Sequence, residues 1–245
     1  GYLGSSRYRA TSETVRIGAA GKNAAGLSWS VSFDGGHVSS KSRHTVLDAS
    51  GKQNIFGLSL SVGKRFEKIS VALNSSIGHS RGKITSSLPG SMQMDKLKTR
   101  VPETLFNVGG DVAYALTEEL SIAAYPQLWV FPKATEKTSI GSHDALSLKN
   151  KAQVFAEVPL SLRGSWAVSS ATDTKIRLKG ELGGSVKVGK LSKESRLFAV
   201  GTEAKEDISQ KNFRRWNGFG TMAVSVKQGR FEGSLAASAA TGDGK

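Results

Sequence analysis

Apolar residues alternate with small or polar residues along most of this chain. The clearest run covers residues 174–188, where Ile176, Leu178 and Leu182 fall on one parity and Lys175 and Arg177 on the other. Such a period of two predicts β-strands whose two faces differ chemically. Comparable runs cover residues 15–19, 29–33, 56–62, 69–73, 106–116, 120–130, 152–166, 222–226 and 231–237. We therefore expect an all-β fold with about 10–12 strands.

The connections between these runs alternate in length. Several runs reach the ~9–11 residues that a tilted membrane-spanning strand needs, whereas ordinary strands have about 5–6. Short turns on one side and long loops on the other are typical of an antiparallel up-and-down transmembrane β-barrel. The short connections are 63–67, 117–119, 167–173 and 227–229, and the long ones are 34–53, 79–103, 132–151 and 189–212.

The polar positions of the alternating runs are expected to face the barrel lumen. They are rich in small residues, such as Ser28, Ser30 and Ser32, and they bring both signs of charge together. A soluble barrel with its apolar face inside would show the same alternation, but water-facing positions would more often carry longer polar side chains. The residues expected to line the lumen are Asp111, Glu157, Arg163, Arg177, Lys179, Glu181, Lys187, Lys227 and Glu232. The expected anchors at the membrane interfaces are Trp29, Tyr114, Trp166, Trp216 and Phe219.

Charge adds a second feature to this picture. The 245 residues carry a formal net charge of +14, and the long connections hold 17 Lys and Arg against 10 Asp and Glu. Basic loops attract polyanions such as lipopolysaccharide or sulfated glycans, although a solvated surface gives the same composition. The candidate polyanion-binding residues are Lys96, Lys98, Arg100, Arg214 and Arg215. We expect no nucleic-acid partner.

The sequence offers little catalytic chemistry. It contains no Cys, which excludes disulfides, a Cys-ligated zinc site and a thiol nucleophile. Residues 184–190 resemble a phosphate-binding loop, but Leu191 replaces its Ser or Thr and no helix follows. The pairs Asp34 with His37, His79 with Ser80, and His143 with Asp144 lack a third partner. We therefore expect no enzyme activity, no catalytic residue, no metal and no cofactor.

The hairpins resemble the translocator domain of autotransporters. GLSWSVSFDGG at residues 26–36 is similar to the first strand of that domain, and residues 56–80 are similar to its next hairpin. FNVGGDVAYAL followed by LSIAAYPQLWVF, and AEVPLSLRGSWAV followed by IRLKGELGGSVKV, resemble later hairpins. FAVGT, followed by NGFGTMAVSVKQGRFEGSLAASAATG, resembles the late part of such domains.

The resemblance implies a bacterial outer-membrane barrel that anchors and helps to export a passenger segment. Its expected partners are membrane lipid, lipopolysaccharide, the outer-membrane assembly machinery and a passenger. We expect a lead-in over residues 1–13 and the barrel over 14–245, with the family's last aromatic strand missing. The alternatives are a related bacterial outer-membrane barrel, and an adhesin or small porin that binds or passes anions.

Overall fold

The protein is all-β. The structure, a computed structural model, describes residues 7–43, 48–87, 96–170, 174–211, 213–228 and 231–241. None of the described residues forms a helix long and apolar enough to cross a membrane. The fifteen strands are β1 (Arg7–Lys22), β2 (Leu27–Arg43), β3 (Asp48–Arg65), β4 (Ile69–Ser87), β5 (Leu97–Ala115), β6 (Leu120–Ala124), β7 (Gln127–Phe131), β8 (Ala134–Ile140), β9 (His143–Asn150), β10 (Gln153–Ser170), β11 (Thr174–Gly189), β12 (Ser192–Ala199), β13 (Lys205–Lys211), β14 (Trp216–Gln228) and β15 (Phe231–Thr241).

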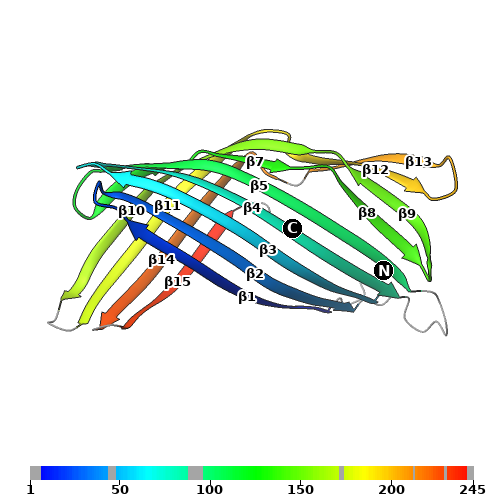
Figure 1. Ribbon diagram of the computed structural model, residues 1–245, viewed down its shortest axis with the longest axis horizontal. Coiled ribbons are helices and arrows are strands. Elements are labelled where there is room, and N and C mark those ends of the chain that lie inside the picture. Colours follow the sequence, from blue (N-terminus) through cyan, green and yellow to red (C-terminus); the bar gives the residue numbers. More distant parts are fainter. Residues whose placement is uncertain are drawn as a thin grey trace, which may run out of the picture.

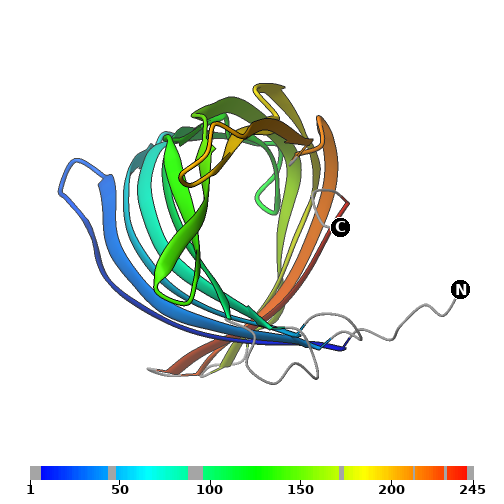
Figure 2. The same cartoon turned by 90° about the vertical axis from the view of Figure 1, so that its right-hand side faces the viewer.

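The strands form one antiparallel up-and-down sheet, as the alternation predicts. Its main path runs β1-β2-β3-β4-β5-β6-β10-β11-β14-β15, so β1 and β15 lie at its two ends. β6, β7 and β8 follow one another along β5, so that they act as one interrupted strand. The sheet curls into a barrel-like shape in which β1–β5 form one wall and β10, β11, β14 and β15 form the opposite wall (Figures 1 and 2).

One interruption in the sheet lies between β6 and β7. Tyr125 and Pro126 separate β6 from β7, and proline has no N–H to donate to a neighbouring strand. The carbonyl oxygen of Pro126 accepts a hydrogen bond from the backbone N–H of Gly110 at 2.9 Å. A Cβ at Gly109 would lie only 2.7 Å from this carbonyl oxygen, so the close approach requires glycine. The backbone N–H of Tyr125 still donates to the carbonyl oxygen of Pro159 on β10 at 3.2 Å, and the side chain of Tyr125 shares the inner face with Ala123 and Gln127.

The long connections are themselves largely strand. β4 and β5 each contain 19 residues, and β8–β9 and β12–β13 form two hairpins on the same side of the sheet. Gly141 has a φ of 60° in the β8–β9 turn, a conformation that glycine adopts readily. Such strands are hard to recognise in the sequence, because Ser, Thr and Lys occupy both faces and no apolar face alternates with a polar one.

Two expectations need correction. Of the expected lead-in over 1–13, residues 7–13 belong to β1 and pair with β2, so this part is not separate from the sheet, and residues 1–6 lie outside the described residues. Phe219 is not an interface anchor. It pairs with Gly183 on the inner face, and its ring contacts Tyr125 edge-on with centroids 6.2 Å apart. The other expected anchors, Trp29, Tyr114, Trp166 and Trp216, are exposed on the outer face.

Trp166 lies flat over a glycine on this outer face. A Cβ built on Gly164 would lie 2.1 Å from Cη2 of the Trp166 ring, whereas a Cβ on Gly180 of β11 would lie 3.7 Å from it. An aromatic ring that lies over a strand glycine covers the backbone there, which has no side chain of its own to cover it. Trp166 is thereby held at the short-turn margin of the sheet.

Candidate functional site: the polar interior and the basic outer surface

The two faces of the sheet have inverted polarity. Along β3, Phe56, Leu58, Leu60 and Val62 are all exposed, while the residues between them point to the inner face. Among the described residues, the buried hydrophobic side chains are Ala123 and Phe155. The buried polar or charged ones are Ser80, Asn107, Asn150, Gln153, Ser161, Ser185, Lys187 and Ser195. A chain that folds in water does the opposite, because burying apolar area drives its folding.

An ion-pair cluster joins three strands of the inner face. Arg163 on β10 donates from Nη1 and Nη2 to Asp111 Oδ2 on β5, each at 3.1 Å, and from Nε to Glu181 Oε1 on β11 at 3.0 Å. The same Glu181 oxygen accepts hydrogen bonds from Ser161 Oγ at 2.6 Å and Tyr125 Oη at 3.3 Å. The Arg163 guanidinium also lies 5.0 Å from the centre of the Tyr125 ring. The carboxylates therefore fix the guanidinium in one orientation.

A second charged pair lies farther along the same face. Lys187 Nζ lies 3.6 Å from Glu157 Oε1, which also accepts a hydrogen bond from Ser185 Oγ at 2.7 Å. Lys187 is only 5% exposed, so its charge requires such partners. Its ammonium also lies 5.6 Å from the centre of the Phe213 ring. This pair links β10, β11 and the segment that precedes β14.

Aromatic side chains fill the interior next to this pair. Phe155 is 3% exposed and packs against Phe213, with ring centroids 4.7 Å apart. Phe131 and Trp129 of β7 stack on Phe155 at 6.2 and 6.4 Å. The indole nitrogen of Trp129 is buried and has no hydrogen-bond partner among the described residues. The cluster occupies the interior toward the β12–β13 hairpin.

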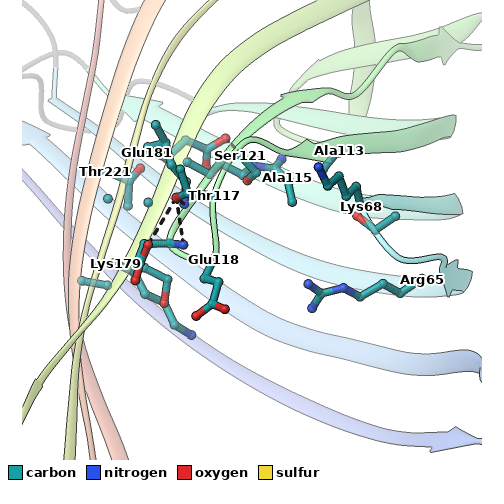
Figure 3. A pocket seen from close by; sticks show the side chains of 18 residues that line it. Arg65, Lys68, Ala113, Ala115, Thr117, Glu118, Ser121, Lys179, Glu181 and Thr221 are labelled. Atoms are coloured by element: carbon teal, nitrogen blue, oxygen red, sulfur yellow. Dashed lines mark hydrogen bonds and ion pairs between the residues drawn. The ribbon is translucent and has the colours of Figure 1, made fainter.

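A cavity of about 590 Å³ remains at the short-turn end of the interior. Arg65 and Lys68, near the β3–β4 turn, lie on one side of it, and Lys179 and Thr221 lie on the other (Figure 3). Its lining carries both signs of charge: the cations of Arg65, Lys68, Arg163 and Lys179, and the carboxylates of Glu118, Glu119 and Glu181. A mixed lining of this kind gives no strong preference for anions.

The residues expected to line the lumen share one face by register. Lys187 pairs with Glu157, Glu181 with Arg163, and Lys175 with Lys227, so all point to the side of the polar interior. Contacts bring Asp111, Arg163 and Glu181 together, and separately Glu157 and Lys187. Arg177, Lys179 and Lys227 are exposed near the short-turn end. The side chain of Glu232 lies outside the described residues.

The expected polyanion-binding residues fall into two separate groups. Lys98 and Arg100 lie within β5, preceded by Lys96, whereas Arg214 and Arg215 lie between β13 and β14. β5 and β14 are not neighbours on the path of the sheet. These five residues therefore do not form a single patch.

The structure reveals instead a row of four cations, of which the sequence analysis named only Arg100. Lys52 on β3 pairs in register with Lys83 on β4, Lys83 with Arg100 on β5, and Arg100 with Lys137 on β8. We call these four residues the basic row. They lie on the outer face, because Leu58, Ile77 and Phe106 of the same strands share their parity. The signal was present in the sequence as a cation four to six residues from the apolar run of each strand.

The histidines form no catalytic arrangement among the described residues. Asp34 pairs with Arg16 and not with His37, whose Nδ1 lies 2.7 Å from Asn54 Oδ1. His79 Nδ1 lies 2.9 Å from Thr104 Oγ1 on the outer face, while Ser80 accepts from Gln53 on the inner face. His143 is exposed at the start of β9, and His44 lies outside the described residues. No group of three or more potential metal ligands occurs in the described part of the chain.

The chain matches no protein-family model, and no curated protein matches it.

Proposed function

We propose that this chain is a bacterial outer-membrane β-barrel domain that serves as a membrane anchor. One observation carries the proposal: the exposed face of the sheet is apolar and the enclosed face is polar and charged. Exposed Leu and Phe are favourable in a lipid environment, and a closed or nearly closed β-sheet satisfies the backbone polar groups there.

The dimensions of the apolar face support this proposal. On β3 the outward residues from Val62 to Phe56 are apolar, and Lys64 and Asn54 flank them on the same face. The stretch between the flanking residues matches the ~9–11 positions of a spanning strand. Trp29 and Trp166 lie near its short-turn margin, where interfacial aromatic residues are expected.

Side chains in the interior favour an anchor over an open pore. The cluster of Asp111, Arg163 and Glu181 and the packed rings of Phe155 and Phe213 lie in the space between the walls. Barrels with few strands generally have interiors filled by side chains. An autotransporter-like role, in which the barrel anchors and helps to export a passenger, is the specific form of this proposal that the hairpin resemblance supports.

A heat-modifiability gel on protein held in detergent, together with carbonate washing of membranes, tests the anchor. We expect a faster-migrating band before heating and retention of the protein in the washed membrane pellet. Protein that stays in the supernatant and shows no band shift would refute a membrane barrel. Linkage to a passenger is tested separately, by expressing the chain behind a reporter domain and measuring protease access to that reporter on intact cells.

Surface cations favour one second candidate, an adhesin for anionic glycans. Lys96 and Arg215 are exposed at the long-connection side, where a cell-surface ligand would approach. Binding to a heparin column that weakens as salt rises would support this role. Absence of binding at low salt would remove it.

A further inference from the structure

The basic row is placed to meet the polar head groups of the membrane. We infer that Lys52, Lys83, Arg100 and Lys137 bind the phosphates of a phosphorylated glycolipid in the outer leaflet, of the lipopolysaccharide class. This inference rests on the proposed function, because it takes the outer face of the sheet to lie in lipid.

In the basic row, side chains of like charge lie directly opposite one another on neighbouring strands. Directly paired side chains on neighbouring strands lie about 4.5–5.5 Å apart at Cβ, and like charges at such sites destabilise a sheet. Of the four residues, Lys137 pairs with Asp144 at 3.4 Å. No ion pair is found for Lys52, Lys83 or Arg100 within the described part of the chain. Three adjacent cations without a carboxylate are stabilised by an external anion.

A cavity accompanies this concentration of charge. It has a volume of about 480 Å³ and is lined by all four residues of the basic row together with Arg81. His37 and Asn54 also line it and are already joined by their own hydrogen bond. Its lining contains no carboxylate. A concave site with converging cations suits a phosphate, which accepts several charge-assisted hydrogen bonds.

The position of the row identifies the source of the phosphate. Lys52 lies four residues beyond Phe56, the last apolar residue of the outer face of β3, which is about 13 Å along the strand. With a strand tilt of about 35–45°, this places the ammonium about 10 Å above the apolar band, within the head-group layer. The row lies on the side of the long connections, which in outer-membrane barrels is extracellular. A phosphate carried by an outer-leaflet lipid is therefore the ligand that the row reaches.

The matched control lies on the same strand. Lys64 shares the outer face of β3 with Lys52 but lies at the opposite margin of the apolar band, beside the β3–β4 turn. Lys205 is exposed on β13, away from the basic row. The double variant K52Q/K83Q and the control K64Q/K205Q remove the same charge. The variant K52R/K83R keeps the charge in place.

The test is a titration of the folded full chain in zwitterionic detergent, read by native mass spectrometry. The probes are a bis-phosphorylated lipid A, the same glycolipid without phosphates, and inorganic phosphate. We expect one lipid A to bind the parent chain, K64Q/K205Q and K52R/K83R, and to bind K52Q/K83Q at least tenfold more weakly. The dephosphorylated glycolipid should bind at least tenfold more weakly than lipid A to all of them.

Three outcomes would overturn the inference. Equal losses in K52Q/K83Q and K64Q/K205Q would show that only net charge matters. Equal affinity for the dephosphorylated glycolipid would exclude recognition of phosphate, and equal affinity for inorganic phosphate would exclude the lipid as its source. The single variant R100Q should also weaken binding if the double variant fails to fold. Failure of the proposed function is read separately, as loss of heat modifiability and membrane retention in the parent chain.

Discussion

Arg163 and Asp111 lie on strands separated by β6, yet Arg163 donates two hydrogen bonds of 3.1 Å to one carboxylate oxygen of Asp111. The contact joins β5 to β10 through the interior as well as through the backbone ladder. Glu181 on β11 pairs with the same guanidinium, so the cluster connects β5, β10 and β11, where the sheet passes from one wall to the other.

Replacing Arg163 should destabilise the sheet. The variant R163M leaves the carboxylates of Asp111 and Glu181 in the interior without their shared cation, at a cost of about 1–3 kcal/mol. We expect a lower urea midpoint for unfolding in detergent, with an unchanged slope. The control is K179Q, which removes an exposed cation from the same face. Equal midpoints for R163M and K179Q would contradict the structural role of the cluster.

The covered glycine of β10 provides a second prediction. The variant G164A places a methyl group into the Trp166 ring and should lower stability by about 1–3 kcal/mol, because the ring must move off the sheet. G180A is the control, since its methyl group would make only an ordinary contact with the same ring at 3.7 Å. Unfolding midpoints and tryptophan emission report both effects. A G164A protein as stable as G180A would show that the ring does not need this position.

A charged residue in the apolar band separates a membrane barrel from a soluble one. Leu60 is 49% exposed near the middle of the outer apolar stretch of β3. In a lipid bilayer, L60R should cost about 2–4 kcal/mol. On a water-facing surface the same change would stay within about 0.5 kcal/mol. Unfolding from lipid vesicles measures the difference, with K64R as the control, and a neutral L60R would count against the anchor.

The basic row should make stability depend on salt when no anionic lipid is present. K83Q removes the central cation from a row of directly opposed like charges, so it should stabilise the sheet by about 0.2–1 kcal/mol at low salt. The gain should shrink in 1 M salt, because the screening length falls to about 3 Å. Thermal or urea midpoints in zwitterionic detergent measure this effect. An equal gain from K64Q would show that the row is not a site of repulsion.

The β12–β13 hairpin should loosen in acid. Arg196 donates to Asp207 from Nε at 2.6 Å and from Nη2 at 3.1 Å, and these bonds lower the pKa of the Asp207 carboxyl. Hydrogen bonds from Lys151 and Lys190 likewise lower the pKa of the Glu194 carboxyl. Each carboxylate contributes stability above its unfolded pKa, near 4, and loses it as the pH falls through the lower folded pKa.

Amide hydrogen exchange, corrected for its intrinsic pH dependence, measures this loosening. Protection of β12 and β13 should fall as the pH drops below about 4, whereas the D207N variant should already be less protected at pH 7. Protection that does not change between pH 5 and pH 2 would contradict the role assigned to the Arg196–Asp207 pair.

The parity of side chains was the most predictable property of this chain. A period of two assigns Arg163, Glu181 and Lys187 to one face without any knowledge of register, since every second residue shares a face. The partners of these residues could not be predicted in the same way. Whether Arg163 meets Asp111 depends on strand order, and whether the Tyr125 hydroxyl meets Glu181 depends on the registers of β6 and β11 against β10.

Phe219 and the basic row show where reasoning from the sequence failed. Aromatic residues near strand ends suggest interface anchors, but the register of β14 against β11 places Phe219 opposite Gly183, inside. The cations of the basic row come from four different strands and lie in segments that the sequence predicts as long connections. Only the pairing of these strands brings Lys52 and Lys137 into one line.

The strand extensions also decide what the chain can display. The β8–β9 hairpin runs as paired backbone from Ala134 to Ile140, a length of about 20 Å, and ends in a tight turn at Gly141 and Ser142. A peptide epitope inserted into that turn would be carried by a paired hairpin and not by an irregular loop. If the sheet spans an outer membrane as proposed, such an epitope would stand clear of the membrane surface, which makes this turn a suitable grafting point for surface presentation of foreign sequences.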